Sequence, residues 1–247
     1  MSPPTVATVW TGYLAESRRP LASLVFIVPL LVVYEAGVCL LGPRAVRNGA
    51  DVWLRQFLEW IGLGQYFLLP LLTICILLGW HYTTRQPWKV SRGVLSSMVV
   101  ESLILAVGLR LILQLQGALL QSIAGPATMA IGMEKVRGLI GFLGAGVYEE
   151  LLFRLILLSL VGWVLLAVAR LRRPATILAI VLTSLVFAAA HYVGPYGEPV
   201  QLARSVFWFS FSFRLLAGVF FGTLFVYRGF GIAAGCHAGY DILVGMF

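Results

Sequence analysis

Long apolar stretches separated by short polar segments run along most of the 247-residue chain. A helix needs about 20 mainly apolar residues to cross a bilayer, and seven stretches approach or exceed that length. The predicted membrane spans are Leu21–Leu41, Tyr66–Trp80, Gly93–Gly117, Gly138–Ala169, Ala175–Tyr192, Ser205–Tyr227 and Phe230–Phe247. No internal repeat or domain boundary interrupts the pattern. The sequence therefore predicts one all-α domain, residues 1–247, folded as a polytopic membrane bundle of about seven transmembrane helices.

The segment Asp51–Ile61 has a different pattern, in which apolar and charged residues alternate at helical spacing and the aromatic residues lie on the apolar side. Helices of this kind lie in the plane of the membrane surface. We therefore expect an interfacial amphipathic helix between the first two spans.

The composition agrees with a membrane protein, because 60% hydrophobic and only 11% charged residues exclude an ordinary soluble domain. The net charge of +8 comes from Lys and Arg residues that lie mostly in short segments between the apolar stretches. This distribution indicates membrane topology rather than nucleic-acid binding, so the lipid bilayer is an expected partner and nucleic acid is not. Cys39, Cys75 and Cys236 lie in apolar stretches without paired spacing, which supports neither a disulfide framework nor a zinc tetrad.

The basic residues also predict an orientation. Nine of them lie in loops on the side of the N-terminus and six in loops on the other side. The more basic side faces the cytoplasm. We expect an integral, multi-pass protein of a prokaryotic cell membrane with a cytoplasmic N-terminus, in which Glu149, His191 and Asp241 lie in the outer half of the bilayer.

Three charged residues, Glu149, Glu150 and Arg154, interrupt the otherwise uncharged span Gly138–Ala169. Charges inside a membrane are costly and mark functional sites by default. On a helix, Glu150 and Arg154 share one face, whereas Glu149 is turned about 100° away from Glu150. A Glu–Arg pair alone is also compatible with a purely structural role. The second, unpaired glutamate favours a reactive site.

Two later spans carry further polar residues. His191 ends Ala175–Tyr192, and His237 and Asp241 lie four residues apart on one face of the last span. Each residue alone is also compatible with an interfacial or packing role. Together with the two glutamates they supply a base, hydrogen-bond donors and an anion partner, which are the groups that hydrolysis needs.

Other hydrolytic chemistries fit less well. The chain has no His-Glu-x-x-His string of a zinc metalloprotease, although two histidines and a glutamate from three spans are compatible with a three-ligand zinc site. No serine has a nucleophile motif around it. Asp241 is the only aspartate in any span, so an aspartyl dyad is excluded. Water activated by a glutamate remains the best supported mechanism.

Three short motifs, each in its own span, resemble those of the CAAX prenyl endopeptidase and bacteriocin-processing family. This family, also called CPBP or Abi, comprises intramembrane glutamic-type proteases. The motifs are Glu149-Glu150-x-x-x-Arg154, Phe187-x-x-x-His191 and His237-x-x-x-Asp241. Their order and spacing make the resemblance specific, and it covers roughly residues 138–247.

The resemblance implies roles for the motif residues. Glu149 and His191 would position and deprotonate the attacking water, while His237 and Asp241 would stabilise the oxyanion. The implied substrate is a membrane-anchored or membrane-spanning protein or peptide.

Glu150 and Arg154 would, by the same resemblance, hold the site together. No metal and no organic cofactor is implied.

The chain departs from the family pattern at two positions. Leu155 follows the arginine where many relatives have glycine, which affects only how closely a neighbouring helix approaches. Asp241 stands where asparagine is commoner, and a carboxyl group donates a hydrogen bond only when it is protonated. Either burial keeps Asp241 neutral, or Asp241 orients His237 and the histidine donates.

Two non-catalytic functions remain as alternatives. One is a membrane binding or immunity protein that keeps the motif residues for packing. The other is a proton-coupled carrier that also uses Glu35, Glu101 and Arg110. A carrier is expected to show repeat symmetry between its halves, and this sequence shows none.

Overall fold

The computed structural model describes residues 6–42, 47–124, 135–167, 174–194 and 197–246. All regular elements in these ranges are helices, which confirms the all-α prediction for this part of the chain. The helices are α1 (Val6–Ser17), α2 (Pro20–Leu41), α3 (Gly49–Trp60), α4 (Leu68–Thr83), α5 (Arg92–Ala124), α6 (Lys135–Glu150), the π-helix η2 (Leu151–Leu158), α7 (Ser159–Ala167), α8 (Ala175–Ala190), α9 (Ser205–Arg228) and α10 (Phe230–Met246).

Among the described residues, four helical stretches are long and apolar enough to cross a membrane: Pro20–Leu41, Arg92–Leu119, Leu139–Ala167 and Ser205–Arg228. The protein is therefore an integral membrane protein. The helices α4 and α8 have 16 residues and α10 has 17. At about 1.5 Å per residue, such helices fall short of a hydrocarbon core about 30 Å thick. Seven full-length spans are therefore not confirmed. Residues 168–169 and 247, at the ends of two predicted spans, lie outside the described residues.

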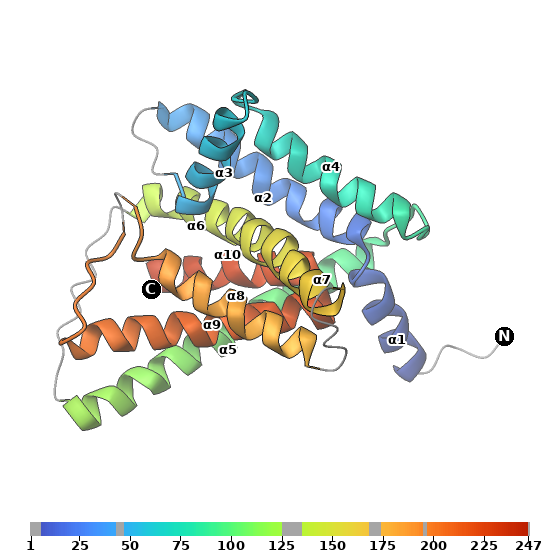
Figure 1. The fold of residues 1–247 in the computed structure, drawn as a ribbon. Coiled ribbons are helices and arrows are strands. Elements are labelled where there is room, and N and C mark those ends of the chain that lie inside the picture. Colours follow the sequence, from blue (N-terminus) through green and yellow to red (C-terminus); the bar gives the residue numbers. More distant parts are fainter. Residues whose placement is uncertain (1–5, 43–46, 125–134, 168–173, 195–196, 247) are drawn as a thin grey trace.

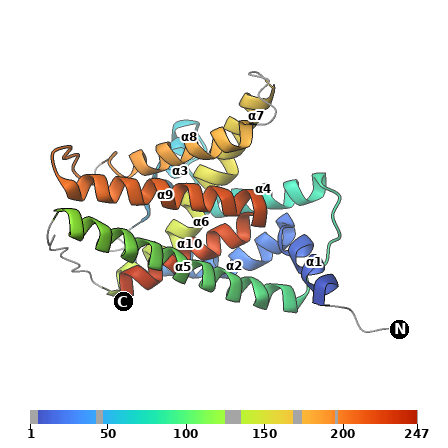
Figure 2. The ribbon, with the colours of Figure 1, turned by 90° about the horizontal axis from the view of Figure 1, so that it is seen from below.

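The last helix, α10, lies in the middle of the bundle and packs against α2, α5, α6 and α9 (Figures 1 and 2). Every residue from Phe230 to Tyr240 except Gly235 is buried. This stretch is rich in glycine and alanine, and small residues let helix backbones approach closely in membrane proteins. The helix that carries His237 is thus enclosed on several sides.

Gly146 brings α6 close to α10. A Cβ atom at position 146 would lie 2.5 Å from the Cβ of Ala238 and 2.6 Å from its backbone nitrogen. Gly146 precedes Glu149 by three residues, and Ala238 follows His237 directly. This close contact therefore places the two glutamates beside the histidine.

The predicted span Gly138–Ala169 is not one regular helix. The α-helical hydrogen bonding of α6 ends at Glu150, and Leu151–Leu158 form a π-helix before α7 begins. Such wider turns are rare and frequently lie at functional sites. No glycine or proline marks this segment in the sequence, so the pattern of apolar residues did not predict it.

Two N-terminal helices differ in part from what the sequence predicts. The helix α1 was not predicted, because residues 6–17 lack a long apolar run. The predicted amphipathic helix corresponds to α3, in which Phe57 and Trp60 are exposed and Asp51 is completely buried. The charged face of α3 therefore points into the bundle.

We predict that Gly146→Ala lowers the stability of the protein. Overpacking a close contact costs about 1–3 kcal/mol, so this variant should unfold at a lower temperature than the wild type in detergent. Gly162→Ala in α7 is the matched control. Apart from the chain neighbours of Gly162 and the backbone of its own helix, no described heavy atom lies within 4 Å of the added methyl group. Alanine is favoured over glycine in a helix by about 1 kcal/mol, so the control should not lose stability. Equal melting temperatures for the two variants would contradict the close contact.

Candidate active site

The residues of the three motifs come from four elements that meet inside the bundle. Glu149 and Glu150 end α6, and Arg154 lies in η2. His191 directly follows α8, and α10 carries His237 and Asp241. The contacts between these side chains define the candidate active site.

Glu150 is completely buried and contacts an arginine and a histidine. Its Oε1 atom lies 3.0 Å from Nη1 of Arg154 and 2.7 Å from Nδ1 of His237. A carboxylate without partners would be very costly at this depth. The two contacts stabilise the Glu150 carboxylate and connect η2 to α10.

Arg154 also packs between two aromatic rings. Its guanidinium lies 4.3 Å from the ring centre of Phe187 in α8 and 5.4 Å from that of Phe221 in α9. Such cation–π contacts are strongest where water is excluded, and Arg154 is only 2% exposed. Arg154 therefore links Glu150 to the two helices on the other side of the site.

The ring of His237 has a fixed orientation. Its Nδ1 atom is hydrogen-bonded to Glu150, and the ring stacks on Phe221 with ring centres 4.4 Å apart. Its Nε2 atom lies 3.7 Å from Oε2 of Glu149 and 3.6 Å from Oδ2 of Asp241. Neither distance is a hydrogen bond. The Nε2 atom therefore faces the space between two carboxyl groups.

His191 owes its orientation to the end of α8. Its Nδ1–H donates to the carbonyl oxygen of Phe187 over 2.8 Å. Carbonyl groups in the last turn of a helix lack helical donors, so the four-residue spacing of Phe187 and His191 gives the ring nitrogen an acceptor. With Nδ1 as the donor, Nε2 of His191 is an acceptor.

Glu149 has a partner that the motifs did not reveal. Its Oε1 atom accepts a hydrogen bond of 2.7 Å from Nδ2 of Asn48, which lies 101 residues earlier in the chain. Its Oε2 atom is buried and has no hydrogen-bond partner among the described residues. The one available signal was that Asn48 is the only asparagine in the sequence.

Two cavities meet at His191. Glu149 and His191 line the smaller one, of about 210 Å³, together with residues of α3. His191, His237 and Asp241 line the larger one, of about 770 Å³. The other walls of the larger cavity contain the charged residues Glu198, Arg204 and Arg214 and the aromatic residues Phe187, Tyr192, Phe207, Phe209, Phe213, Phe221 and Tyr240. His191 thus lines both cavities, whereas Glu149 lines only the smaller one and Asp241 only the larger one.

The loop after His191 is attached to the wall of the larger cavity. The backbone N–H of Glu198 donates to the carbonyl oxygen of His191 over 2.9 Å. The side chain of Glu198 accepts hydrogen bonds from Arg214 in α9. These hydrogen bonds hold the pKa of the Glu198 carboxyl group below its ordinary value. The ion pair therefore connects Glu198, which is hydrogen-bonded to the backbone of His191, to α9.

The groups that the alternative functions would use have other partners. Within the described part of the chain, no three His, Cys, Asp or Glu side chains form a group that could hold a metal ion. Glu35 pairs with Arg55 at 2.9 Å, and Glu101 pairs with Arg228 at 2.6 Å. The search for metal-binding groups thus does not favour a three-ligand zinc site, and the two ion pairs do not favour a carrier.

Comparison with known proteins gives one family-model match, in the C-terminal part of the chain. Residues 132–243 match the Rce1-like family model, described as type II CAAX prenyl endopeptidase Rce1-like. No curated protein and no solved structure matched the chain. All seven motif residues from Glu149 to Asp241 lie inside the matched range, and the family consists of membrane endopeptidases. The resemblance inferred from the three motifs is therefore confirmed: residues 132–243 of this integral membrane protein match the Rce1-like model of type II CAAX prenyl endopeptidases.

Proposed function

We propose that this protein is a glutamic-type intramembrane endopeptidase, which hydrolyses a peptide bond in membrane-anchored or membrane-spanning substrates. The observation that carries the proposal is the position of His191 between two cavities. Glu149 lies in the smaller cavity, and His237 and Asp241 lie in the larger one. A water in the smaller cavity and a peptide in the larger one would meet beside His191.

In the first step, Glu149 acts as the general base. The Oε2 atom of Glu149 and the Nε2 atom of His191 are both hydrogen-bond acceptors. One water molecule can therefore donate one O–H group to each of them. Glu149 removes one proton, and the water oxygen forms a bond to the carbonyl carbon of the peptide. A correctly placed general base typically accelerates a reaction by about 10²–10⁴-fold.

The electron pair of the carbonyl bond moves to the peptide oxygen, which becomes negatively charged. We propose that the Nε2–H of His237 donates to this oxygen. The donation requires the imidazolium form, because Nδ1–H already donates to Glu150. Loss of one such donor typically costs about 3–4 kcal/mol of transition-state stabilisation. The proton held by Glu149 then passes to the peptide nitrogen as the carbon–nitrogen bond breaks, which releases a carboxylic acid and an amine.

The larger cavity indicates how the substrate is selected. Its aromatic walls suit an extended apolar peptide, and its place among membrane helices limits access to chains held at the membrane. With the N-terminus in the cytoplasm, as the basic loops indicate, the site would lie in the outer half of the bilayer.

We predict different effects for the two adjacent glutamates. Glu149→Gln should give a stable protein whose cleavage rate is about 10²–10⁴-fold lower, because only the base is lost. Glu150→Ala should lower the melting temperature as well as activity, since an unpaired buried Arg154 typically costs about 3–5 kcal/mol. The assay uses fluorogenic peptides tethered by an alkyl chain in detergent micelles, and the peptide that the wild type cleaves fastest serves for all variants.

The double variant Glu150→Ala/Arg154→Leu is the control for charge. It should recover part of the lost stability but not the activity, because His237 would still lack the acceptor for its Nδ1–H. An unstable Glu149→Gln together with a stable, inactive Glu150→Gln would contradict the assigned roles.

A separate prediction concerns Asp241, which lies 3.6 Å from His237. If Asp241 donates to the oxyanion as a neutral acid, Asp241→Asn should keep at least the wild-type cleavage rate, because the amide is a permanent donor. Asp241→Leu, of similar size and without a donor, should lose about 10²–10³-fold in kcat. Equal kcat values for the two variants would show that Asp241 does not stabilise the oxyanion.

A further inference from the structure

We propose that Asn48 is a positioning residue for Glu149, because its amide group holds one carboxylate oxygen so that the other faces the water. This inference rests on the proposed role of Glu149 as the base. Asn48 lies far outside the matched range 132–243, so the N-terminal half of the chain would contribute to the active site.

The side chain of Asn48 accepts one hydrogen bond and donates another. Its Oδ1 atom accepts from the backbone N–H of Ala50 over 2.8 Å and thereby caps the N-terminus of α3. Because the oxygen is used by the cap, the NH₂ group points to Oε1 of Glu149 at 2.7 Å. The cap therefore determines which end of the amide meets the carboxylate.

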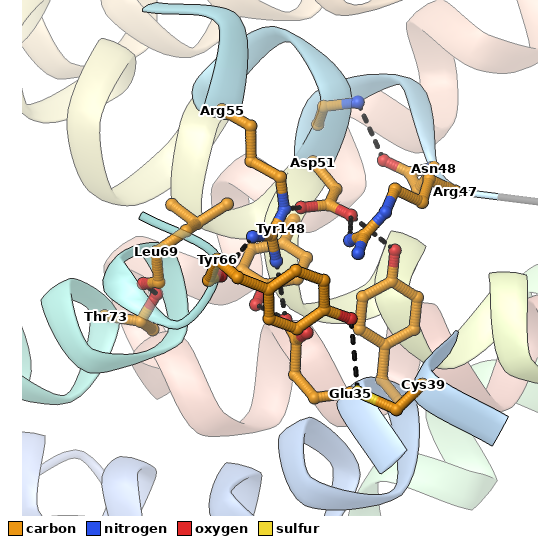
Figure 3. Close-up of polar contacts among 12 residues, drawn as sticks. Glu35, Cys39, Arg47, Asn48, Asp51, Arg55, Tyr66, Leu69, Thr73 and Tyr148 are labelled. Atoms are coloured by element: carbon orange, nitrogen blue, oxygen red, sulfur yellow. Dashed lines mark hydrogen bonds and ion pairs between the residues drawn. The ribbon is translucent and has the colours of Figure 1, made fainter. Parts of the chain in front are cut away.

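Asn48 itself is held by the ion pairs of α3, shown in Figure 3. Asp51 is completely buried and accepts hydrogen bonds from three side chains. The donors are Nη1 of Arg47 at 2.7 Å, Nε of Arg55 at 2.5 Å and the hydroxyl group of Tyr34 at 2.7 Å. These contacts fix the first turn of α3, where Asn48 is the cap.

The same cluster extends to the residue next to Glu149. Arg55 also donates to Oε1 of Glu35 over 2.9 Å, and the hydroxyl group of Tyr148 donates to the same oxygen over 2.5 Å. Glu35 lies in α2, Arg55 in α3 and Tyr148 in α6, so three helices share one network (Figure 3). Asn48 and Glu149 are therefore placed by neighbouring parts of a single rigid cluster.

The hydrogen bond from Asn48 to Oε1 of Glu149 prevents a competing contact of this carboxylate. The Oε2 atom of Glu149 lies 3.7 Å from Nε2 of His237, so a small rotation of the carboxylate would form a direct hydrogen bond with the histidine. Such a hydrogen bond would occupy both the base and the oxyanion donor. Hydrogen bonds to ionised groups are short and strong, and the bond from Asn48 opposes this rotation.

The test compares two variants that keep the helix cap. Serine and aspartate both cap helices well, but neither supplies the amide N–H. Asn48→Ser should melt near the wild-type temperature, with kcat reduced about tenfold or more and KM unchanged, as expected for loss of a charge-assisted hydrogen bond. Asn48→Asp should reduce kcat further, because a second carboxylate would face Glu149. The alkyl-tethered fluorogenic peptide chosen with the wild type is the substrate for all variants.

Two controls separate positioning from folding. Asn48→Ala removes the cap as well as the donor, so its melting temperature should fall together with kcat. Glu59→Gln lies on the exposed side of α3 and should match the wild type in both measurements. Wild-type kcat in Asn48→Ser and Asn48→Asp would overturn the proposal, as would a rise in KM alone or a kcat that follows the melting temperature across all three Asn48 variants.

The outcome for Glu149→Gln distinguishes this inference from the proposed function. If Glu149→Gln is inactive and Asn48→Ser is normal, only the positioning role of Asn48 is wrong. If Glu149→Gln is as active as the wild type, the proposed function itself is wrong.

Discussion

The buried carboxylate of Glu150 is the constraint on which the site depends. It is completely enclosed and lies 3.0 Å from Arg154 and 2.7 Å from His237. Burying these groups costs several kcal/mol per ion, and only good mutual contacts offset that cost. The contacts therefore fix η2 against α10 and turn Nε2 of His237 towards Glu149. They also pair the charge of Glu150, which leaves Glu149 as the carboxylate that we propose for the chemistry.

The packing of the bundle supports this arrangement from two sides. The absence of a side chain at Gly146 lets α6 lie against Ala238, next to His237. On the opposite side, the network of Asp51, Arg55 and Glu35 draws the charged face of α3 inward. The two cavities beside His191 thus have walls from both the N-terminal and the C-terminal half of the chain.

The sequence predicted the features that follow from helical spacing. Glu150 and Arg154, Phe187 and His191, and His237 and Asp241 are each four residues apart, so their side chains share a helix face whatever the tertiary structure. The sequence did not predict the π-helix after Glu150, because apolar residues fit both helix types equally well. It also did not predict the contact of Asn48 with Glu149, since residues 101 positions apart meet only through the packing of α3. A helix was found at the expected amphipathic segment, and its charges point inward because Glu35 and Tyr34 provide partners there.

The central claim is that Glu149 activates water and does not attack the peptide itself. Single-turnover cleavage in H₂¹⁸O, followed by mass spectrometry of both product and protein, tests this claim directly. The account predicts one ¹⁸O atom in the new C-terminal carboxylate of the product and none in the protein segment that contains Glu149. A product without ¹⁸O, together with label on Glu149, would show a covalent acyl intermediate and contradict the account.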